Sequence, residues 1–259
     1  MNRHRKGQPG GNSPGLTIQL PLIGLSGQSG AGKSTLAELL SGACNISRMS
    51  FATSIREAAV IAFGDFLNQK YFTEWKDTSL PTHLINNLNN DLLRINLCHN
   101  ALCKLVANGH PVPTDNAPLG CLSMALRGSR TPRDILCALG TWFCKEVAQN
   151  YWIEQLEKRI GPNKNNILID DVRLSAEREW ILSHGGCLIL IVKKGQRKPP
   201  LSAHITERDF GHHSEYSFIV KAKHGDIDGL LKQSITGIGK WLTVKLHRQA
   251  NNWKIQNFK

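Results

Sequence analysis

Residues 16–40 read LTIQLPLIGLSGQSGAGKSTLAELL, and this stretch decides the fold class of the 259-residue chain. It begins with a largely apolar run over residues 16–25, which predicts a buried strand. Glycines follow at once, and the sequence KSTLAELL of residues 33–40 then has the pattern of a helix that ends at Gly42. The stretch therefore predicts a strand, a glycine-rich loop and a helix in direct succession.

The loop of residues 27–34 matches the pattern G-x4-G-K-[ST] of phosphate-binding loops. In such a loop the backbone N–H groups surround the phosphates, and the N-terminus of the following helix adds positive potential. Lys33 is then placed to reach the β- and γ-phosphates of a nucleotide, and the Ser34 hydroxyl to ligate Mg²⁺. The alternative is a glycine turn with an incidental lysine, and the flanking strand and helix favour the first interpretation.

Further along, short apolar runs alternate with helical patterns, and this alternation predicts a parallel α/β sheet. The run of residues 187–193 is the clearest, because continuous apolar residues are typical of strands that are buried on both faces. The further predicted strands are residues 48–51, 167–170, 187–193 and 216–220. The further predicted helices are residues 52–66, 84–106, 132–160 with a kink or break at Gly140, the stretch between the strands at 167–170 and 187–193, and 227–238.

Composition and charge divide the chain into a central domain and basic appendages. The chain has 32 Lys and Arg against 20 Asp and Glu, a net charge of +12. Three acid-free stretches, residues 1–16, 193–198 and 240–259, hold as many basic residues as the whole excess. The rest of the chain has as many acidic as basic residues, which argues against a globally basic nucleic-acid-binding domain. The tails can still contact polyanions. The predicted organisation is a disordered basic tail (1–15), one domain (16–239) with an inserted helical and loop segment (68–130) and a basic lid loop (193–215), and a basic C-terminal extension (240–259).

The longest apolar run, residues 187–192, is far shorter than the ~18 residues that a membrane-spanning helix needs, so no membrane span is expected. The N-terminal basic cluster is followed by Gly, Pro, Gln and Asn rather than by the apolar stretch of a secretory signal. Seven cysteines at irregular spacings then predict reduced thiols and a cytoplasmic location.

The sequence ILIDDVR of residues 167–173 places two acids and an arginine at the carboxyl end of a predicted strand. Ligands of parallel α/β sheets bind at this edge. One of Asp170 and Asp171 can hold the water shell of a metal or position an attacking phosphate, and Arg173 can neutralise a substrate phosphate. The alternative for either aspartate is a cap of the following helix, and the strand register decides which one faces a ligand. Arg130 and Arg133, around a predicted helix start, also suit an anionic group.

Five motifs of this sequence, in order, resemble those of the deoxynucleoside monophosphate kinases of tailed phages, within the wider nucleoside monophosphate kinase group. They are GQSGAGKST, FATSIREAA, RTPRDILCALGT, DDVRLSAERE and HITERDF, and they span residues 20–235 apart from the segment before Arg127. The resemblance implies a P-loop NTPase-type three-layer sandwich whose five-stranded parallel sheet has the phosphate-loop strand at its centre. It also implies a monophosphate-binding region between the second and third strands, a lid between the fourth and fifth, and a host-cytoplasmic location for a phage protein.

Carried over by position, the resemblance assigns roles to individual residues, and Lys33, Arg133 and Arg173 recur in several of them. The implied ATP-binding residues are Gly27, Ser29, Gly30, Ala31, Gly32, Lys33, Ser34 and Thr35. The implied acceptor-binding residues are Arg130, Arg133, Lys145, Arg173, His204 and Glu207. The catalytic set is Lys33, Arg133, Asp170, Asp171 and Arg173, with Ser34 and Asp170 on the metal.

Four positions depart from the family's pattern. Lys145 stands where the family has an arginine, and it keeps the charge but loses the bidentate fork. The others are Cys137 in place of glutamine, Thr206 in place of serine and Ala176 in place of asparagine. These changes bear on phosphate affinity and on acceptor specificity.

The expected function is transfer of the γ-phosphate of Mg·ATP to a deoxynucleoside 5′-monophosphate. Three alternatives stay open: a kinase for another small acceptor, a nucleotide-dependent regulatory or nucleic-acid-associated protein, and a relative that binds ATP without turnover. The expected partners are nucleotides rather than a membrane, and the segment of residues 68–130 is a candidate dimer surface or substrate clamp.

Overall fold

The computed structural model describes residues 19–113, 116–195, 210–223 and 225–257. Within these ranges five strands form one parallel sheet in the order β2-β3-β1-β4-β5. The central strand, β1, is the one that precedes the glycine-rich loop. The predicted parallel sheet with this strand at its centre is therefore confirmed. The strands are β1 (Ile23–Ser26), β2 (Ser47–Met49), β3 (Ile167–Val172), β4 (Cys187–Lys193) and β5 (Phe218–Ala222).

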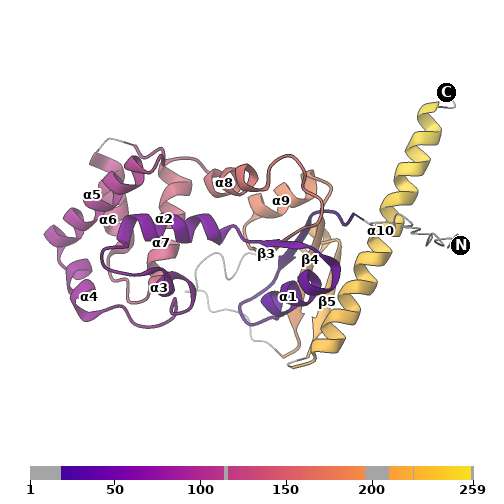
Figure 1. Cartoon of the computed structure of the whole chain (residues 1–259), viewed down its shortest axis with the longest axis horizontal. Helices are drawn as coiled ribbons and strands as arrows, with labels where there is room; N and C mark the ends of the chain where they lie inside the picture. Colours follow the sequence, from indigo (N-terminus) through magenta and orange to yellow (C-terminus); the bar gives the residue numbers. More distant parts are fainter. Residues whose placement is uncertain (1–18, 114–115, 196–209, 224, 258–259) are drawn as a thin grey trace, which may run out of the picture.

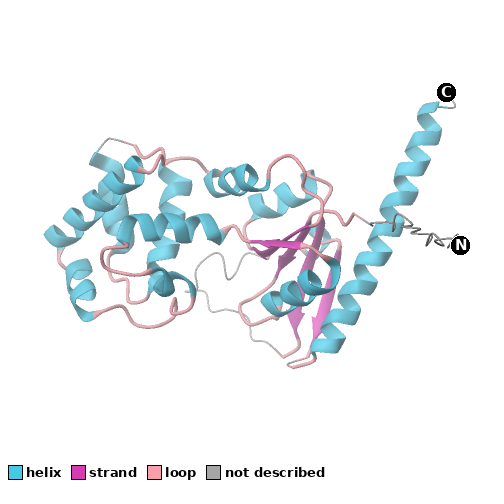
Figure 2. Ribbon diagram, in the orientation of Figure 1, coloured by secondary structure: helices cyan, strands magenta, loops and turns pink. Residues whose placement is uncertain are grey.

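Helices cover both faces of this sheet and give three layers (Figure 2). On one face α1 (Lys33–Cys44) and α10 (Ile227–Asn257) share an apolar core with β1 and β4. On the other face α8 (Tyr151–Ile160) and α9 (Ser175–Ser183) pack through side chains such as Leu156 and Ile181. Alternate residues of each strand point to the two cores, which is the period of an extended chain.

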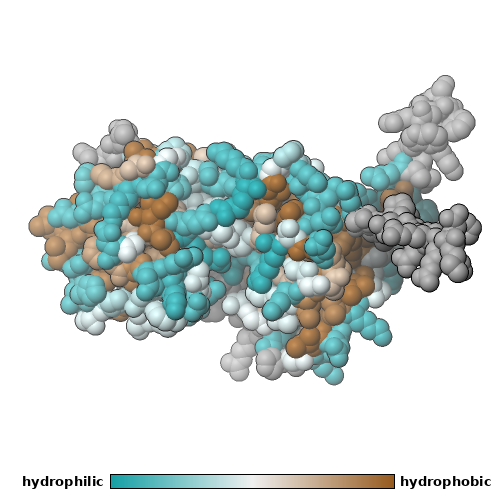
Figure 3. Space-filling model, in the orientation of Figure 1, coloured by the Kyte–Doolittle hydropathy of each residue, from teal (hydrophilic) through white to brown (hydrophobic). Residues whose placement is uncertain are grey.

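Between β2 and β3 the chain forms a helical lobe with its own apolar core, centred on fully buried residues such as Phe63, Phe72 and Phe143. The lobe extends from the sheet to one side, and Figure 3 shows hydrophilic side chains over the middle of the molecule. Its first residues follow β2 directly, and α8 leads from the lobe back to the sheet. The lobe contains α2 (Ala52–Phe63), α3 (Gln69–Thr73), α4 (Thr82–Asn89), α5 (Asp91–Ala107), α6 (Asn116–Leu126) and α7 (Pro132–Glu146).

The prediction of a single helix over residues 84–106 is wrong, because the chain breaks there into α4 and α5. Asn90 lies between them in an extended conformation (φ −92°, ψ 121°), and its side-chain oxygen accepts a hydrogen bond from Leu93 N at 3.0 Å. An asparagine that caps a new helix leaves the helical conformation to do so. The short helix α3 and the helix α6 were not predicted.

The N-terminus of α7 is confirmed. Thr131 and Asp134 form a reciprocal capping box, and Pro132 occupies the first turn. The predicted interruption of the segment 132–160 lies elsewhere than at Gly140: α7 is continuous to Glu146, and the chain leaves the helical conformation at residues 147–150, before α8. The Gly140 carbonyl accepts a hydrogen bond from Trp152 Nε1 at 3.0 Å.

Several ends also differ from the predictions. Strand β1 begins at Ile23, after Pro21, which has no N–H to donate to a sheet. Helix α1 passes through Gly42 and ends before Asn45, whose φ is 50°. Helix α10 continues from the predicted end at residue 238 to Asn257, so most of the basic C-terminal extension belongs to the same helix. In the described part of the chain, no helix has the length and apolar character needed to cross a membrane.

Candidate functional site

The glycine-rich loop connects the end of β1 to the start of α1 through left-handed backbone conformations. Gly27 has φ of 143°, and a Cβ atom there would lie 2.4 Å from the Ile191 carbonyl oxygen of β4. Gly32 has φ of 100° immediately before the first residue of α1. Both positions require glycine, since other residues rarely adopt these angles. The two glycines therefore fix a tight turn that ends at a helix N-terminus.

Lys33 is turned back into this loop. Its side chain is buried, with only 8% of the residue exposed, and its Nζ donates hydrogen bonds to the carbonyl oxygens of Gly27 at 2.6 Å and Gln28 at 2.8 Å. An ammonium group held at a helix N-terminus adds to the positive potential that the backbone creates there. The next two residues, Ser34 and Thr35, are exposed in the first turn of α1.

The two aspartates of β3 lie beside the last residues of β1. The register pairs Gly24 with Ile169 and Ser26 with Val172, and an irregularity between these pairs places Asp170 and Asp171 next to the end of β1. Neighbouring strands are about 4.8 Å apart. The carboxylates are therefore at the edge of the sheet from which the loop starts.

Asp170 is buried and paired. It follows the alternation of Leu168 and so belongs to the face of β3 that α1 covers. Its Oδ2 accepts a hydrogen bond from Arg48 Nε at 2.7 Å and forms an ion pair with the same guanidinium. Burial and the neighbouring Asp171 raise the pKa of Asp170, against the lowering effects of Arg48 and Arg56. Asp170 is thus a partly compensated carboxylate within the electrostatic reach of Arg56.

Asp171 has a different role, because it caps a helix from another part of the chain. Its carboxylate accepts hydrogen bonds from Ser50 Oγ at 2.6 Å, Phe51 N at 2.8 Å and Ala52 N at 2.9 Å. These groups form the start of α2. The alternative of a capping aspartate is therefore the one realised for Asp171, with the difference that the capped helix precedes β3 in the sequence.

Lys76 of the α3–α4 connection lies within electrostatic reach of three arginines, and we call the four residues the cation cluster: Lys76, Arg56 of α2, Arg133 of α7 and Arg173 after β3. Arg56 connects the cluster to Asp170. Burial, followed by the charges of Arg133 and Arg56 and more weakly that of Arg173, lowers the pKa of Lys76. Among the residues that the structure describes, Asp77 is the one that acts in the opposite direction on this group. Cations gathered so closely repel one another, and an anionic ligand would relieve the repulsion.

Arg133 is oriented by the start of α7 and by Asp77. Its backbone N–H donates to the Lys76 carbonyl oxygen at 2.9 Å, and its Nη2 donates to Asp77 Oδ2 at 3.0 Å in a two-pronged ion pair. Hydrogen bonding from Arg133 holds the pKa of Asp77 below its usual range. The pair joins α7 to the segment that carries Lys76, which keeps two members of the cation cluster together.

Arg178, which is only 2% exposed, stabilises the turn after β3 through hydrogen bonds. Its Nη1 donates to the Arg173 carbonyl oxygen at 2.9 Å, and its Nε donates to Glu215 Oε2 at 2.8 Å. Glu215 Oε1 also accepts from His212 N at 2.7 Å. Arg178 therefore connects the turn that bears Arg173 to the segment that leads into β5.

Glu177 closes the same turn. Its Oε2 accepts hydrogen bonds from the backbone N–H groups of Arg173 at 2.6 Å and Leu174 at 2.9 Å. Burial, together with the charge of Asp171, raises the pKa of Glu177 to about 7. The carboxyl group therefore titrates near neutral pH in the folded protein and near pH 4.5 in an unfolded chain.

We expect this shift to make folding stability fall as the pH rises from 4.5 to about 7, because only the folded state still holds the proton in that interval. Glu177→Gln keeps an acceptor oxygen and removes the titration, so the variant should be more stable than the wild type by about 3 kcal/mol at pH 8. Urea unfolding across this pH range measures the effect. Glu179→Gln, on the exposed side of α9, is the control, and an unchanged pH dependence in Glu177→Gln would contradict the assignment.

Some of the residues that the sequence singled out are not brought to this place. Arg130 precedes α7 and is exposed. Lys145 lies in the last turn of α7, twelve residues from Arg133 and hence about 18 Å further along the helix. The lid residues His204 and Glu207 lie outside the described residues. The structure thus gathers the loop, Asp170, Asp171 and Arg173, and it places Lys145 at the opposite end of α7 from Arg133.

Sequence reasoning missed Arg48, Arg56, Lys76, Glu177 and Arg178 as parts of this site. Three of them, Arg56, Glu177 and Arg178, lie within the quoted motifs FATSIREAA and DDVRLSAERE, and so carried a usable signal. Lys76 lies in the segment of residues 68–130, whose sequence has no clear periodicity, and only the packing of the lobe brings it to the site.

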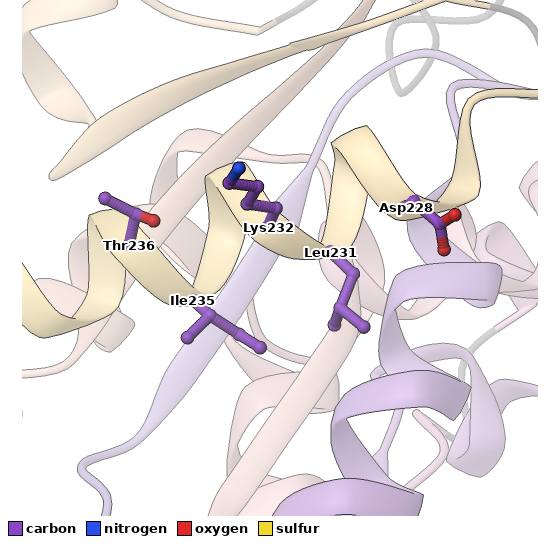
Figure 4. Close-up of a pocket in the computed structure, with 5 residues that line it drawn as sticks. All are labelled: Asp228, Leu231, Lys232, Ile235 and Thr236. Atoms are coloured by element: carbon purple, nitrogen blue, oxygen red, sulfur yellow. The ribbon is translucent and has the colours of Figure 1, made fainter.

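In the described part of the chain, no three His, Cys, Asp and Glu side chains come together in a way that would hold a metal ion. A surface hollow lies along α10, lined by Asp228, Leu231, Lys232, Ile235 and Thr236 (Figure 4). None of its lining residues belongs to the glycine-rich loop or to the cation cluster.

Comparison of the chain with protein-family models finds no match, and comparison with curated proteins finds none either. The residues at the carboxyl edge of the sheet are therefore the basis on which a function can be assigned.

Proposed function

We propose that the protein is a P-loop kinase that transfers the γ-phosphoryl group of Mg·ATP to the phosphate of a deoxynucleoside 5′-monophosphate. The observation that carries this proposal is the pairing of two cationic centres at one edge of the sheet. One is the glycine-rich loop with Lys33, and the other is the cation cluster. Two anionic ligands meet in a phosphotransferase, and each needs a cationic centre of its own.

The glycine-rich loop is assigned to the donor. Its positive-φ glycines and the N-terminus of α1 suit a polyphosphate, which backbone N–H groups bind without large side chains in the way. Lys33 would leave its carbonyl partners for the β- and γ-phosphates of ATP. This exchange is inexpensive, since the ammonium changes one set of oxygen acceptors for another.

The cation cluster is assigned to the acceptor phosphate. Lys76, Arg56 and Arg173 come from three separate segments, and their mutual repulsion lowers folding stability unless an anion is bound. An acceptor monophosphate supplies two negative charges near neutral pH. Arg56 also lies within electrostatic reach of Asp170, which connects the cluster to the aspartates beside the loop.

The reaction needs no covalent enzyme intermediate. An oxygen of the acceptor phosphate attacks the γ-phosphorus of ATP, the bond from that phosphorus to the bridging oxygen breaks, and ADP leaves with the electron pair. Positioning and charge neutralisation supply most of the catalysis of such a transfer. Lys33 neutralises charge on the donor side, and Arg173 and Arg133 on the acceptor side.

Magnesium enters as part of the substrate Mg·ATP. Mg²⁺ prefers oxygen ligands and commonly binds through one or two protein oxygens, substrate phosphates and waters. The exposed Ser34 hydroxyl suits the direct contact. Asp170, which already holds Arg48, suits a contact with the water shell of the ion.

The identity of the acceptor rests on the motif resemblance, and an acceptor panel tests it. We expect purified protein to form ADP from Mg·ATP only when a deoxynucleoside monophosphate is added, with an equal amount of the deoxynucleoside diphosphate. ADP formation without an acceptor would instead indicate an ATPase. Turnover with a different small acceptor would indicate the alternative kinase, and ATP binding without turnover would contradict the proposed activity.

Lys76→Met tests the acceptor site. Loss of one charged contact should raise the KM for the acceptor by about 10- to 100-fold and leave the KM for ATP unchanged. The same variant should unfold at a higher urea concentration, because the pKa of Lys76 is lowered in the folded state and the charge therefore costs stability at neutral pH.

Lys70→Met is the matched control, since Lys70 is exposed on α3 and lies over the Trp75 ring. It should leave both KM values unchanged. A Lys76→Met variant that lost affinity for ATP and acceptor alike would speak for general damage and against an acceptor site.

A further inference from the structure

Residues 210–216, which we call the junction segment, contact two separate parts of the proposed active site. The segment leads into β5, whereas the turn that bears Arg173 leads from β3 into α9 (Figure 1). The glycine-rich loop leaves the sheet from β1, which β4 separates from β5. Two neighbouring residues of the segment, Glu215 and Tyr216, make hydrogen bonds in different directions. One side chain bonds toward the turn and the other toward the loop.

Tyr216 connects the junction segment to the glycine-rich loop. Its hydroxyl donates a hydrogen bond to the Phe210 carbonyl oxygen at 2.5 Å. The single proton of that hydroxyl is then used, so the Ser26 hydroxyl, at 3.2 Å, is the donor to the Tyr216 oxygen. Ser26 is fully buried and Tyr216 is buried. Ser26 directly precedes Gly27, whose carbonyl oxygen accepts a hydrogen bond from Lys33 Nζ.

Glu215 connects the same segment to the turn after β3. Its Oε2 accepts a hydrogen bond from Arg178 Nε at 2.8 Å, and Arg178 Nη1 in turn donates to the Arg173 carbonyl oxygen at 2.9 Å. The hydrogen bonds from His212 N and Arg178 hold the pKa of Glu215 below its usual range, so the carboxylate is ionised at neutral pH. Because Arg178 is buried, the loss of this partner would leave its charge uncompensated.

The contact between Glu215 and Arg178 closes over the backbone of the junction segment at Gly211. This glycine has φ of 60°, and a Cβ atom there would lie 2.6 Å from Glu215 Oε1 and 2.7 Å from Arg178 Nη2. The alternative is that Glu215 and Tyr216 each close a local turn before β5. In that case a change at one of them would leave the part of the site that the other contacts unaltered.

We propose that Glu215 and Tyr216 are positioning residues, which hold the turn bearing Arg173 and the glycine-rich loop at a fixed separation through the junction segment. The inference rests on the proposed function, in which these two parts bind the acceptor and the donor. Transfer requires the reacting atoms to lie about 3 to 3.5 Å apart, and a displacement of about 1 Å can lower the rate about 100-fold. Neither residue has to contact a nucleotide for this role.

Tyr216→Phe removes the hydroxyl and keeps the ring. We expect kcat to fall by about 10-fold, because the two sites lose their fixed separation. The dissociation constants of a non-hydrolysable ATP analogue and of the acceptor monophosphate, each measured alone by calorimetry, should change by less than about 2-fold.

The matched control is Tyr151→Phe, which also removes the hydroxyl of a buried tyrosine, here one that lies 2.7 Å from His110 Nδ1. It should leave kcat unchanged, and urea unfolding compares the loss of stability in the two variants. Equal kcat values in Tyr216→Phe and Tyr151→Phe would overturn the positioning role while leaving the kinase assignment intact.

Glu215→Gln tests the other half of the connection. Whichever way the amide turns, either Arg178 Nε or His212 N faces its NH2 group and loses an acceptor. We expect a fall in kcat of about 10-fold here too. Since both residues act through one segment, the double variant should lose about 10- to 20-fold rather than the ~100-fold of independent effects. A loss of ~100-fold would mean that the two residues act separately.

Hydrogen exchange tests the connection without turnover. Tyr216→Phe should raise the exchange rates of backbone amides in residues 172–178, and Glu215→Gln those in residues 26–33, by about 5-fold, whereas Tyr151→Phe should raise neither. Unchanged exchange at these remote positions would overturn the inference even if kcat fell. A wild-type protein without phosphotransfer would instead contradict the proposed function, and the exchange rates would still decide whether the junction segment connects the two parts.

Discussion

Lys33→Met is expected to lower kcat/KM for phosphotransfer by about 100- to 1000-fold or more, the largest effect of any single substitution in this chain. The ammonium is the one charged side chain that the glycine-rich loop itself provides, and it is already desolvated at 8% exposure. Charge that develops on the transferring phosphate is stabilised far more by a desolvated cation than by water. Methionine fills a similar volume and keeps the burial, so the change removes the charge with little change in packing.

Steady-state kinetics with Mg·ATP and the best acceptor measure this effect, and urea unfolding measures the cost in stability. The Gly27 and Gln28 carbonyl oxygens lose a hydrogen-bond donor, for which we expect about 1 to 2 kcal/mol. Ser34→Ala provides a second variant that leaves the core untouched, and it should lower turnover by weakening the contact with magnesium. A folded Lys33→Met protein with normal phosphotransfer would show that the loop is not the donor site.

The parallel sheet followed from local signals in the sequence, whereas the central position of β1 was implied by the motif resemblance. Continuous apolar runs such as that of β4 mark strands buried on both faces, and the glycines after β1 mark the turn into α1. Parallel strands with helices between them leave few topologies. The capping box of Thr131 and Asp134 is similarly local, since both partners lie within one turn.

The cation cluster could not be predicted from local sequence patterns. Lys76 belongs to a connection between two short helices, and its position depends on how the lobe packs around residues such as Phe72 and Leu84. The break at Asn90 was missed for a related reason. When apolar residues continue on both sides, an asparagine inside one helix cannot be distinguished in the sequence from an asparagine that caps a second helix. The length of α10 was missed because none of the side chains of residues 239–249 is buried, so the apolar periodicity of a packed helix stops after Ile238.

The adjacent aspartates are a case in which one residue of register decides the chemistry. The sequence left the roles of Asp170 and Asp171 open, because neighbouring residues of a strand point to opposite faces. In the fold, Asp170 belongs to the face of α1 and pairs with Arg48, whereas Asp171 holds the start of α2. The two carboxylates therefore differ in what each contributes.

We expect substitution of Asp171 to lower mainly the stability of the protein, and substitution of Asp170 to lower mainly its turnover. Asp171→Ala removes three hydrogen bonds at the start of α2, two of them from backbone N–H groups, and should lower the free energy of unfolding by about 2 to 4 kcal/mol. It should also weaken acceptor binding, because α2 carries Arg56 into the cation cluster.

Asp170→Asn should have the opposite profile. Burial and Asp171 raise the pKa of Asp170, so its charge lowers stability at neutral pH. In Asp170→Asn, Arg48 loses its ionic partner, but its side chain is 40% exposed and can be hydrated. The variant should thus unfold at nearly the wild-type urea concentration. Because the carboxylate is assigned to the water shell of magnesium, kcat should fall by about 100-fold. Raising the Mg²⁺ concentration should restore part of the activity of Asp170→Asn and none of that lost in Asp171→Ala. Equal losses of stability in the two variants would mean that both aspartates are capping residues, and the metal would then have to be held by Ser34 and the substrate phosphates alone.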